Sequence, residues 1–174
     1  MEQLTIRRAT SDDIFEMVNL VNIAYRSKEV KGWTSEADII VGHRIDHEQL
    51  KQLIEMNNSF IFLYLNVDKS IIGTVHLQVE QGVGYIGLLT THPKNQNRGI
   101  GKILLQYAED YCFKNYGINS FEISVLSTRV ELIDFYERRG YIFTGHVDSY
   151  PIEEKVGTPL KDVKILHFKK QSDD

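Results

Sequence analysis

The chain has 174 residues, of which 42% are hydrophobic and 25% are charged, and its formal net charge at pH 7 is −4. These values are typical of a globular protein, and the length fits one domain, residues 1–174, with a sizeable core. An acidic balance gives no reason to expect nucleic acid as a partner, and no stretch has the length and apolarity of a signal-peptide core or a membrane span. A single cysteine excludes an internal disulfide, so we expect a cytoplasmic protein that contacts neither nucleic acid nor membrane.

The first half of the chain predicts one strand and two helices. Residues 4–8 alternate between apolar and polar side chains, which is typical of a strand. Thr10 or Ser11 can cap the helix that follows, and two aspartates occupy its first turn, where negative charge is favourable. Asp46 can cap a second, short helix, whereas residues 27–43 show no clear period.

The second half predicts a sheet with one helical crossover. Residues 85–91 read as a strand, and from Ile100 the apolar residues, Cys112 among them, recur at helical spacing. The strand expected over residues 120–125 should run parallel to 85–91, because a helix lies between them. The other expected elements are strands over 60–65 and 71–79 joined by a hairpin turn, a helix near 128–138, a strand over 141–146, a loop over 148–162 and a last strand over 163–168.

The junction between strand 85–91 and its helix carries the sequence QNRGIGK, residues 96–102. A helix N-terminus offers unpaired backbone N–H groups and a partial positive charge. Two glycines spaced Gly-x-Gly let the backbone curve around a ligand, and Arg98 and Lys102 add positive charge. The pattern predicts a phosphate or pyrophosphate site, although on this turn alone a strand-to-helix connection that merely needs glycine is an equal alternative.

Two familiar phosphate-binding motifs do not fit this junction. A Walker A loop needs glycine at the position of Gln96 and serine or threonine at that of Ile103. A dinucleotide-binding fingerprint needs a third glycine at the position of Leu104. Both motifs are therefore excluded.

The junction does resemble the Q/R-x-x-G-x-G/A motif of the GNAT superfamily of N-acetyltransferases, with Gln96, Gly99 and Gly101 at its defining positions. Residues 127–141, STRVELIDFYERRGY, resemble the family's later helix, which carries a tyrosine and then glycine plus an aromatic residue. The resemblance covers the chain well from about Phe60 onward. Within the superfamily, the sequence is similar to a bacterial-type subgroup without an assigned substrate. It implies an α+β fold with a central mixed, mostly antiparallel sheet, whose one parallel strand pair is splayed around the cofactor, flanked by helices.

The resemblance further implies acetyl-CoA as cosubstrate. Its pantetheine arm would lie between the two parallel strands, and its pyrophosphate would lie in the glycine turn, with Arg98 as the additional bidentate charge. Arg129 stands where the family often has asparagine, so it could contact the cofactor or an acidic group of the substrate, or merely cover the surface. The residues expected to bind the cofactor are Leu89, Thr90, Thr91, Gln96, Asn97, Arg98, Gly99, Ile100, Gly101, Lys102 and Arg129.

Two residues are expected to be catalytic. Tyr136 occupies the family's catalytic tyrosine position and would protonate the departing thiolate, the alternative being a core tyrosine packed beside Phe135. Glu80, at the end of a strand beside the central one, is the candidate base acting through water. Glu122 is a weaker candidate, and each glutamate is otherwise a solvated strand residue. No metal is expected, because the histidines show no ligand spacing.

The expected reaction moves an acetyl group to a primary amine of a small molecule or peptide by direct attack. Where relatives recognise their acceptors, this chain has Trp33, Glu36, Arg44 and Tyr150, which we expect to bind the substrate. Trp33 could seat a cationic amine, or it could instead anchor an irregular loop. A non-catalytic acyl-CoA-binding sensor or regulatory module is the alternative function. Many relatives dimerise, so a homodimer is one assembly left open.

Overall fold

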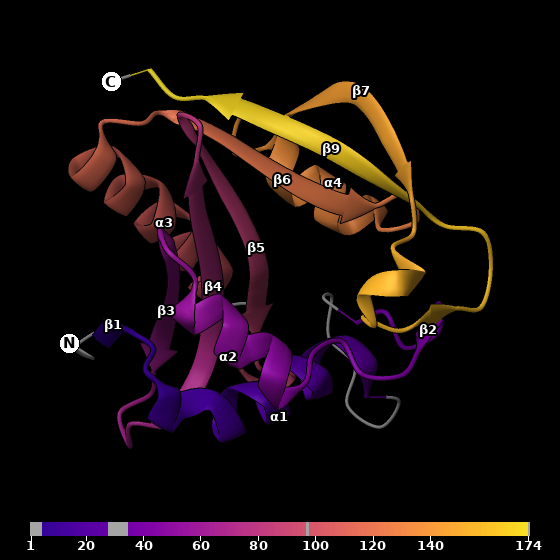
Figure 1. Cartoon of the computed structure of the whole chain (residues 1–174), viewed down its shortest axis with the longest axis horizontal. Helices are drawn as coiled ribbons and strands as arrows, with labels where there is room; N and C mark the ends of the chain where they lie inside the picture. Colours follow the sequence, from indigo (N-terminus) through magenta and orange to yellow (C-terminus); the bar gives the residue numbers. More distant parts are fainter. Residues whose placement is uncertain (1–4, 28–34, 97, 174) are drawn as a thin grey trace.

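The computed structural model describes residues 5–27, 35–96 and 98–173. Its centre is a seven-stranded sheet with the strand order β1-β3-β4-β5-β6-β9-β7, flanked by helices (Figure 1). The helices are α1 (Ile14–Arg26), α2 (His47–Glu55), α3 (Ile100–Tyr116) and α4 (Val130–Glu137). The strands of this sheet are β1 (Thr5–Arg8), β3 (Ser59–Leu65), β4 (Ile71–Glu80), β5 (Val83–Thr91), β6 (Ser120–Leu126), β7 (Ile142–Ser149) and β9 (Lys164–Gln171).

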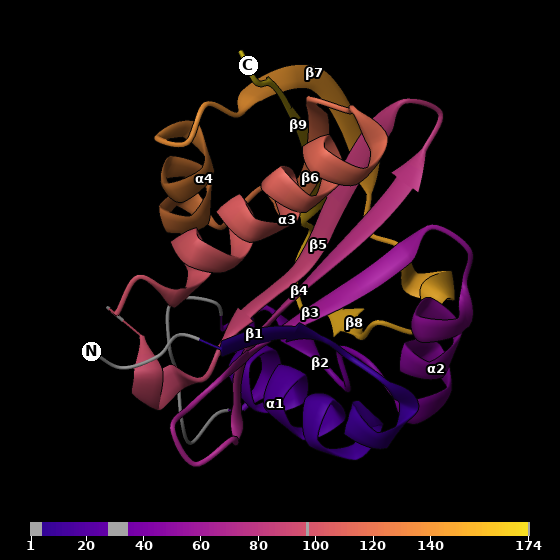
Figure 2. The same cartoon turned by 90° about the vertical axis from the view of Figure 1, so that its left-hand side faces the viewer.

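Strand β3 shows how the helices cover both faces of the sheet. All of its residues are buried, and successive side chains of a strand point to opposite faces. Phe60 and Phe62 belong to the core under α3, whereas Ile61 and Leu63 belong to the core under α1 and α2 (Figure 2). The strand therefore lies in the interior of the sheet, with apolar layers above and below it.

Helix α3 packs across β3, β4 and β5. Its buried stripe includes Leu104, Ala108 and Cys112, and the thiol of Cys112 is free and fully buried, as the helical spacing predicted. The helix starts and ends at glycines with left-handed backbone angles, Gly99 at φ 75° and Gly117 at φ 68°. Among the helices in the described residues, none combines the length and apolarity needed to cross a bilayer.

The parallel pairing predicted for β5 and β6 is confirmed, and it is short. The paired positions are Gly84 with Phe121 and Tyr85 with Glu122, close to the start of each strand. Beyond them each strand stays paired on its other side, β5 with β4 and β6 with β9, while the two separate from one another (Figure 1). The mixed α+β sheet with one parallel pair agrees with the expected fold class.

One region differs from the expectation. Within the predicted loop over 148–162 the structure forms β8 (Thr158–Pro159), which pairs with β2 (Ile40–Val41) from the stretch without a clear period. Strands of two residues are too short to show an alternating pattern, so no periodicity could reveal them. The Arg26 guanidinium donates hydrogen bonds to two carbonyls that flank this pair of strands. They belong to Gly42, directly after β2, at 3.0 Å, and to Val156, two residues before β8, at 2.8 Å.

Candidate active site

A cavity of about 320 Å³ lies where the end of β5 meets the start of α3. Gly99 holds the chain in a left-handed conformation immediately before the helix, which a residue with a Cβ rarely adopts. The first backbone N–H groups of α3 thus open at this cavity without intrahelical acceptors. Its lining residues are Thr91, Gln96, Gly99, Ile100, Gly101, Lys102, Glu131, Phe135, Arg138 and Arg139.

The charge of this cavity is predominantly positive, because Lys102, Arg138 and Arg139 face one acidic residue, Glu131. Arg139 is held in place by its hydrogen bond to the carbonyl of Phe135 at 2.7 Å and by stacking on that ring. Its Nε is buried and has no hydrogen-bond partner among the residues that the structure describes. Burial and the neighbouring Arg138 lower the pKa of Arg139. The helix terminus and these cations together suit a phosphate-bearing ligand.

The structure brings most of the predicted turn residues together in this cavity. Arg98, expected as the additional charge, is exposed and is not among the lining residues. Asn97 lies outside the described residues. Arg138 and Arg139 are the cations that the sequence analysis missed, although their position in the second motif, between Glu137 and Gly140, was the available signal.

A larger cleft of about 1060 Å³ opens where β5 and β6 separate. Its walls come from α1, β4, β5, β6, α4, β9 and the segment from β7 to Val156, together with Glu36 and Arg44. Leu89, Arg129 and Tyr136 line it together with Glu36, Arg44 and Tyr150, so residues predicted for three separate roles meet in one place. Trp33 lies outside the described residues.

A bulge in β5 shapes the floor of the cleft. The register of β4 and β5 shifts between Thr74 and His76, and Leu88 takes a positive φ of 46°. Hydroxyls of Thr74 and Thr90 both donate to the Leu88 carbonyl, at 2.9 and 3.0 Å. The backbone is therefore fixed in this unusual conformation, and the fully buried Thr90 side chain serves it rather than lining either cavity.

The Tyr136 side chain reaches the cleft from α4. Its ring packs edge-on against Phe135 and Tyr141, with centroids 5.2 and 5.6 Å apart, so it is also a core residue. Burial is the main cause that raises the pKa of Tyr136, and the neighbouring Tyr25 raises it further. The phenol therefore stays protonated at neutral pH. No described residue forms a hydrogen bond with its hydroxyl.

The two candidate bases differ in position. Glu122, on β6, lines the cleft and lies beside Tyr85. Burial is the main cause that raises the pKa of Tyr85, and Glu122 is the second. Glu80 is exposed at the end of β4 and is not among the lining residues, although it too acts on Tyr85. The structure thus brings Glu122, but not Glu80, to the wall of the cleft that holds Tyr136.

The predicted acceptor residues lie in a charged part of the cleft. Glu36 is buried 3.9 Å from the Arg26 guanidinium, and burial raises the pKa of this glutamate while Arg26 opposes the shift. Arg44 lies over the ring of Tyr25, 5.6 Å from its centroid. The Tyr150 hydroxyl donates to the Val156 carbonyl at 3.0 Å, so part of its polar capacity serves the loop.

Comparison with known proteins places the chain in a family. The model of the acetyltransferase (GNAT) family matches residues 19–141. The chain belongs to the GNAT acetyltransferase family. Its enzyme class is therefore acyltransferase, as the two sequence motifs predicted. No curated protein sequence matches the chain significantly.

Solved structures of several acetyltransferases share the fold. The ribosomal-protein-S18-alanine N-acetyltransferase of Escherichia coli has a TM-score of 0.73 at 14% identity, covering 99% of this chain and 96% of that one. A spermidine/spermine N-acetyltransferase of Vibrio cholerae gives 0.66 at 19% identity, covering 96% and 91%. An IAA acetyltransferase of Bacillus cereus gives 0.68 at 16% identity, covering 98% and 100%. At these identities the likeness concerns the fold and not the substrate.

Proposed function

We propose that this GNAT protein is an acetyl-CoA-dependent N-acetyltransferase that acetylates a primary amine of a small molecule or peptide by direct attack. The observation that carries the proposal is the position of the two cavities along β5. A cationic cavity at the start of α3 lies at the end of β5, and along that strand the cleft opens toward Tyr136. A long ligand with phosphates at one end and a thioester at the other matches this arrangement.

The charge of the small cavity supports acetyl-CoA as the cofactor. The backbone N–H groups of Gly101 and Lys102, with the side chains of Lys102, Arg138 and Arg139, would hold the pyrophosphate. Gln96, Asn97, Arg98, Gly99 and Ile100 remain proposed members of this cradle. The backbone of Leu89, Thr90 and Thr91 would hold the pantetheine arm, and Arg129, buried at the start of α4, would contact it from the opposite wall.

Bound acetyl-CoA would supply an activated acetyl group, whose C–S bond breaks as the amine nitrogen forms the amide. Tyr136 would give its phenolic proton to the departing sulfur, because burial keeps that proton in place at neutral pH. The amine must lose a proton to a base. We retain Glu80 as this base through water, with Glu122 as the competing assignment.

These two glutamates can be separated by a pH–rate profile. Glu80→Gln is expected to lower kcat/KM and to remove the acidic limb of the pH profile of kcat/KM, because a neutral amide cannot accept the proton. Glu122→Gln is expected to keep the limb. The opposite pattern would transfer the role to Glu122.

The acceptor is proposed from the other wall of the cleft. Glu36, Arg44, Tyr150 and Trp33 are the proposed contacts, and an amine suits a cleft that also holds Glu122. Structural neighbours are named for acceptors as different as spermidine and a ribosomal protein, which supports an amine as the shared chemistry.

The first experiment is thermal unfolding with acetyl-CoA, CoA, NAD and ATP in parallel. Stabilisation by acetyl-CoA and CoA alone is expected, and at about 100 times the Kd it amounts to ~2.7 kcal/mol or a rise of roughly 2–8 °C in Tm. Gly99→Glu and Lys102→Ala should weaken it, whereas Lys114→Ala, an exposed lysine at the far end of α3, should not. An absence of any shift with either CoA ligand would contradict the proposal.

A further inference from the structure

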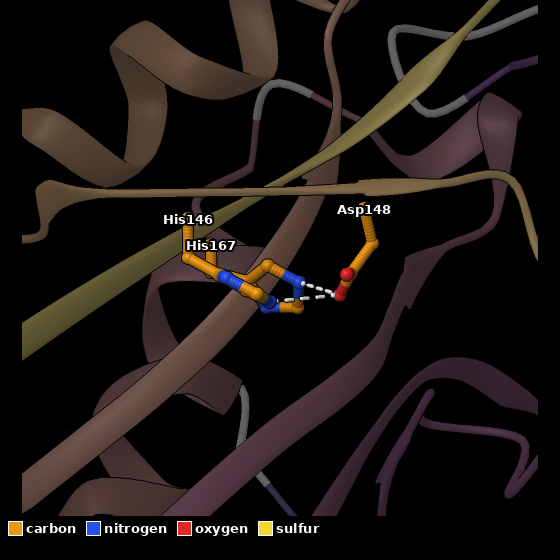
Figure 3. Close-up of side chains that lie close together, drawn as sticks. All are labelled: His146, Asp148 and His167. Atoms are coloured by element: carbon orange, nitrogen blue, oxygen red, sulfur yellow. Dashed lines mark hydrogen bonds and ion pairs between the residues drawn. The ribbon is translucent and has the colours of Figure 1, made fainter.

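Three side chains in the wall of the large cleft converge on one point (Figure 3). Nε2 of His167 lies 2.7 Å, and Nε2 of His146 lies 3.1 Å, from the same carboxylate oxygen of Asp148, Oδ2. One ligand-capable atom from each of the three residues lies within 4.8 Å of the others. The GNAT reaction as proposed above assigns no role to any of them.

The strands that carry these residues are shaped to bring them together. His146 and Asp148 lie two apart on β7 and therefore on one face, while His167 lies on the neighbouring β9. Between Phe143 and Val147 the strand β7 advances four residues while β9 advances two, so β7 bulges, with Gly145 at φ 86°. The Thr144 hydroxyl donates to the His167 carbonyl at 3.0 Å and fixes the bulge. Such bulges serve to direct side chains near functional sites.

A role for His167 as a free proton acceptor does not agree with its contacts. Its Nε2 forms a hydrogen bond with the Asp148 carboxylate, and its Nδ1 lies 3.2 Å from the Ser124 hydroxyl. Neither ring nitrogen is left to reach an amine. The same pattern suits a metal ligand, because a ligating imidazole typically donates its other N–H to a nearby oxygen that fixes the ring.

We propose that His146, Asp148 and His167 bind a divalent transition-metal ion, with Zn²⁺ as the preferred ion, through two imidazole Nε2 atoms and one carboxylate oxygen. Imidazole and carboxylate donors suit such ions, and three protein ligands leave at least one coordination position open. At metal–ligand distances of ~2.0–2.1 Å, ligand atoms of a tetrahedral site lie roughly 3.3 Å apart. The two imidazole nitrogens lie 3.1 and 2.7 Å from the Asp148 oxygen and need only a small outward shift from it, and all three ligand atoms lie within 4.8 Å of one another.

The position of this site would let an acceptor molecule reach the open coordination position of the ion. The side chains of His146, Asp148 and His167 are 63%, 53% and 26% exposed, so an ion can enter from solvent. The residues line the same cleft as Tyr136 and Glu36. A nitrogen or oxygen atom of an acceptor could bind the ion there. Binding of the ion itself goes beyond the proposed acetyl transfer and does not depend on it.

The test is calorimetric titration of ZnCl₂ into protein stripped with chelator and freed of any histidine tag. One ion per chain is expected, with CoCl₂ giving visible d–d absorption at the same stoichiometry. His146→Gln, Asp148→Asn and His167→Gln should each abolish stoichiometric binding, and Ser124→Ala should weaken it by ~10–100-fold. His43→Gln is the matched control and should bind as the wild type does, because His43 is exposed and outside the cluster.

A second measurement needs only the wild type. Nitrogen NMR of the imidazoles should show zinc-dependent shifts for two of the six histidines. No stoichiometric binding to the wild type would overturn the proposal, as would binding that survives all three ligand substitutions. Neither result would touch the CoA-dependent stabilisation that tests the proposed acetyl transfer.

Discussion

Lys170 Nζ lies 2.7 and 2.9 Å from the two carboxylate oxygens of Glu109, and this ion pair ties β9 to α3. The two side chains are only 18% and 5% exposed, and burial raises the pKa of Glu109 while Lys170 opposes the shift. Removing one partner leaves a buried charge without compensation. Lys170→Met should therefore lower the free energy of unfolding by about 3–5 kcal/mol in urea titrations.

The double variant Glu109→Leu/Lys170→Met is the control for this prediction. It removes both charges and keeps apolar volume, and so should recover most of the lost stability. A single variant that unfolds at the same urea concentration as the wild type would show that the pair contributes nothing.

Tyr136→Phe should lower kcat by roughly 10²–10⁴-fold, the usual contribution of a general acid, and leave the Kd of acetyl-CoA nearly unchanged. The phenyl ring keeps the packing against Phe135 and Tyr141, so stability should hold. Steady-state kinetics and equilibrium binding check the two halves of this expectation. Tyr107→Phe on α3, packed against Phe62 away from the cleft, is the matched control. Full activity of Tyr136→Phe across the pH range would remove Tyr136 as the acid.

His76 should make the protein less stable in mild acid. Its Nε2 lies 2.8 Å from the Ser59 hydroxyl, which donates to the Leu53 carbonyl, and burial lowers the pKa of His76 from 6.5 to about 4. Between these two values the unfolded chain binds more protons than the folded one. The free energy of unfolding therefore falls as the pH drops from about 6.5 toward 4, by at most ~3 kcal/mol from this group.

Urea unfolding at several pH values checks this expectation with His76→Gln. Glutamine keeps an N–H donor for Ser59 but does not titrate, so the dependence on pH should flatten. His43→Gln, at an exposed histidine, is the matched control. An unchanged slope in His76→Gln would assign the acid sensitivity to other groups.

Gly73→Ala should destabilise the protein by about 1–3 kcal/mol through overpacking. A Cβ at Gly73 would lie 2.8 Å from Leu104 Cδ1 and 2.9 Å from Ile100 Cγ2, both in the first turns of α3. Because the same turns form the proposed phosphate cradle, the variant should also bind CoA more weakly. Gly87→Ala is the stability control, since a Cβ there meets no atom within 4 Å. Equal stability of the two variants would show that α3 can shift without cost.

The sequence predicted those features that depend on neighbours along the chain. Asp46 caps α2 through its bond from the Gln49 amide at 2.8 Å, the stripe of α3 is buried, and β5 and β6 run parallel as the intervening helix required. Each follows from local chemistry or from one crossover rule.

The features that it missed depend on pairings between distant strands. His146 and His167 meet only because β7 bulges beside β9, and no spacing along the chain encodes that register. The pairing of β2 with β8 joins segments that are each two residues long. Arg138 and Arg139 were visible in the motif, but their place beside the α3 turn depends on how α4 packs.

The burial of Cys112 has a practical consequence for measuring turnover. The side chain is fully buried, and burial raises the pKa of its thiol to about 11, so almost no thiolate is present at neutral pH. Aromatic disulfide reagents should therefore detect free CoA as it is released, with no background from folded enzyme. The slow rate at which Cys112 itself is labelled would then measure how often α3 separates from the sheet. One reagent would therefore report both catalysis and opening of the core.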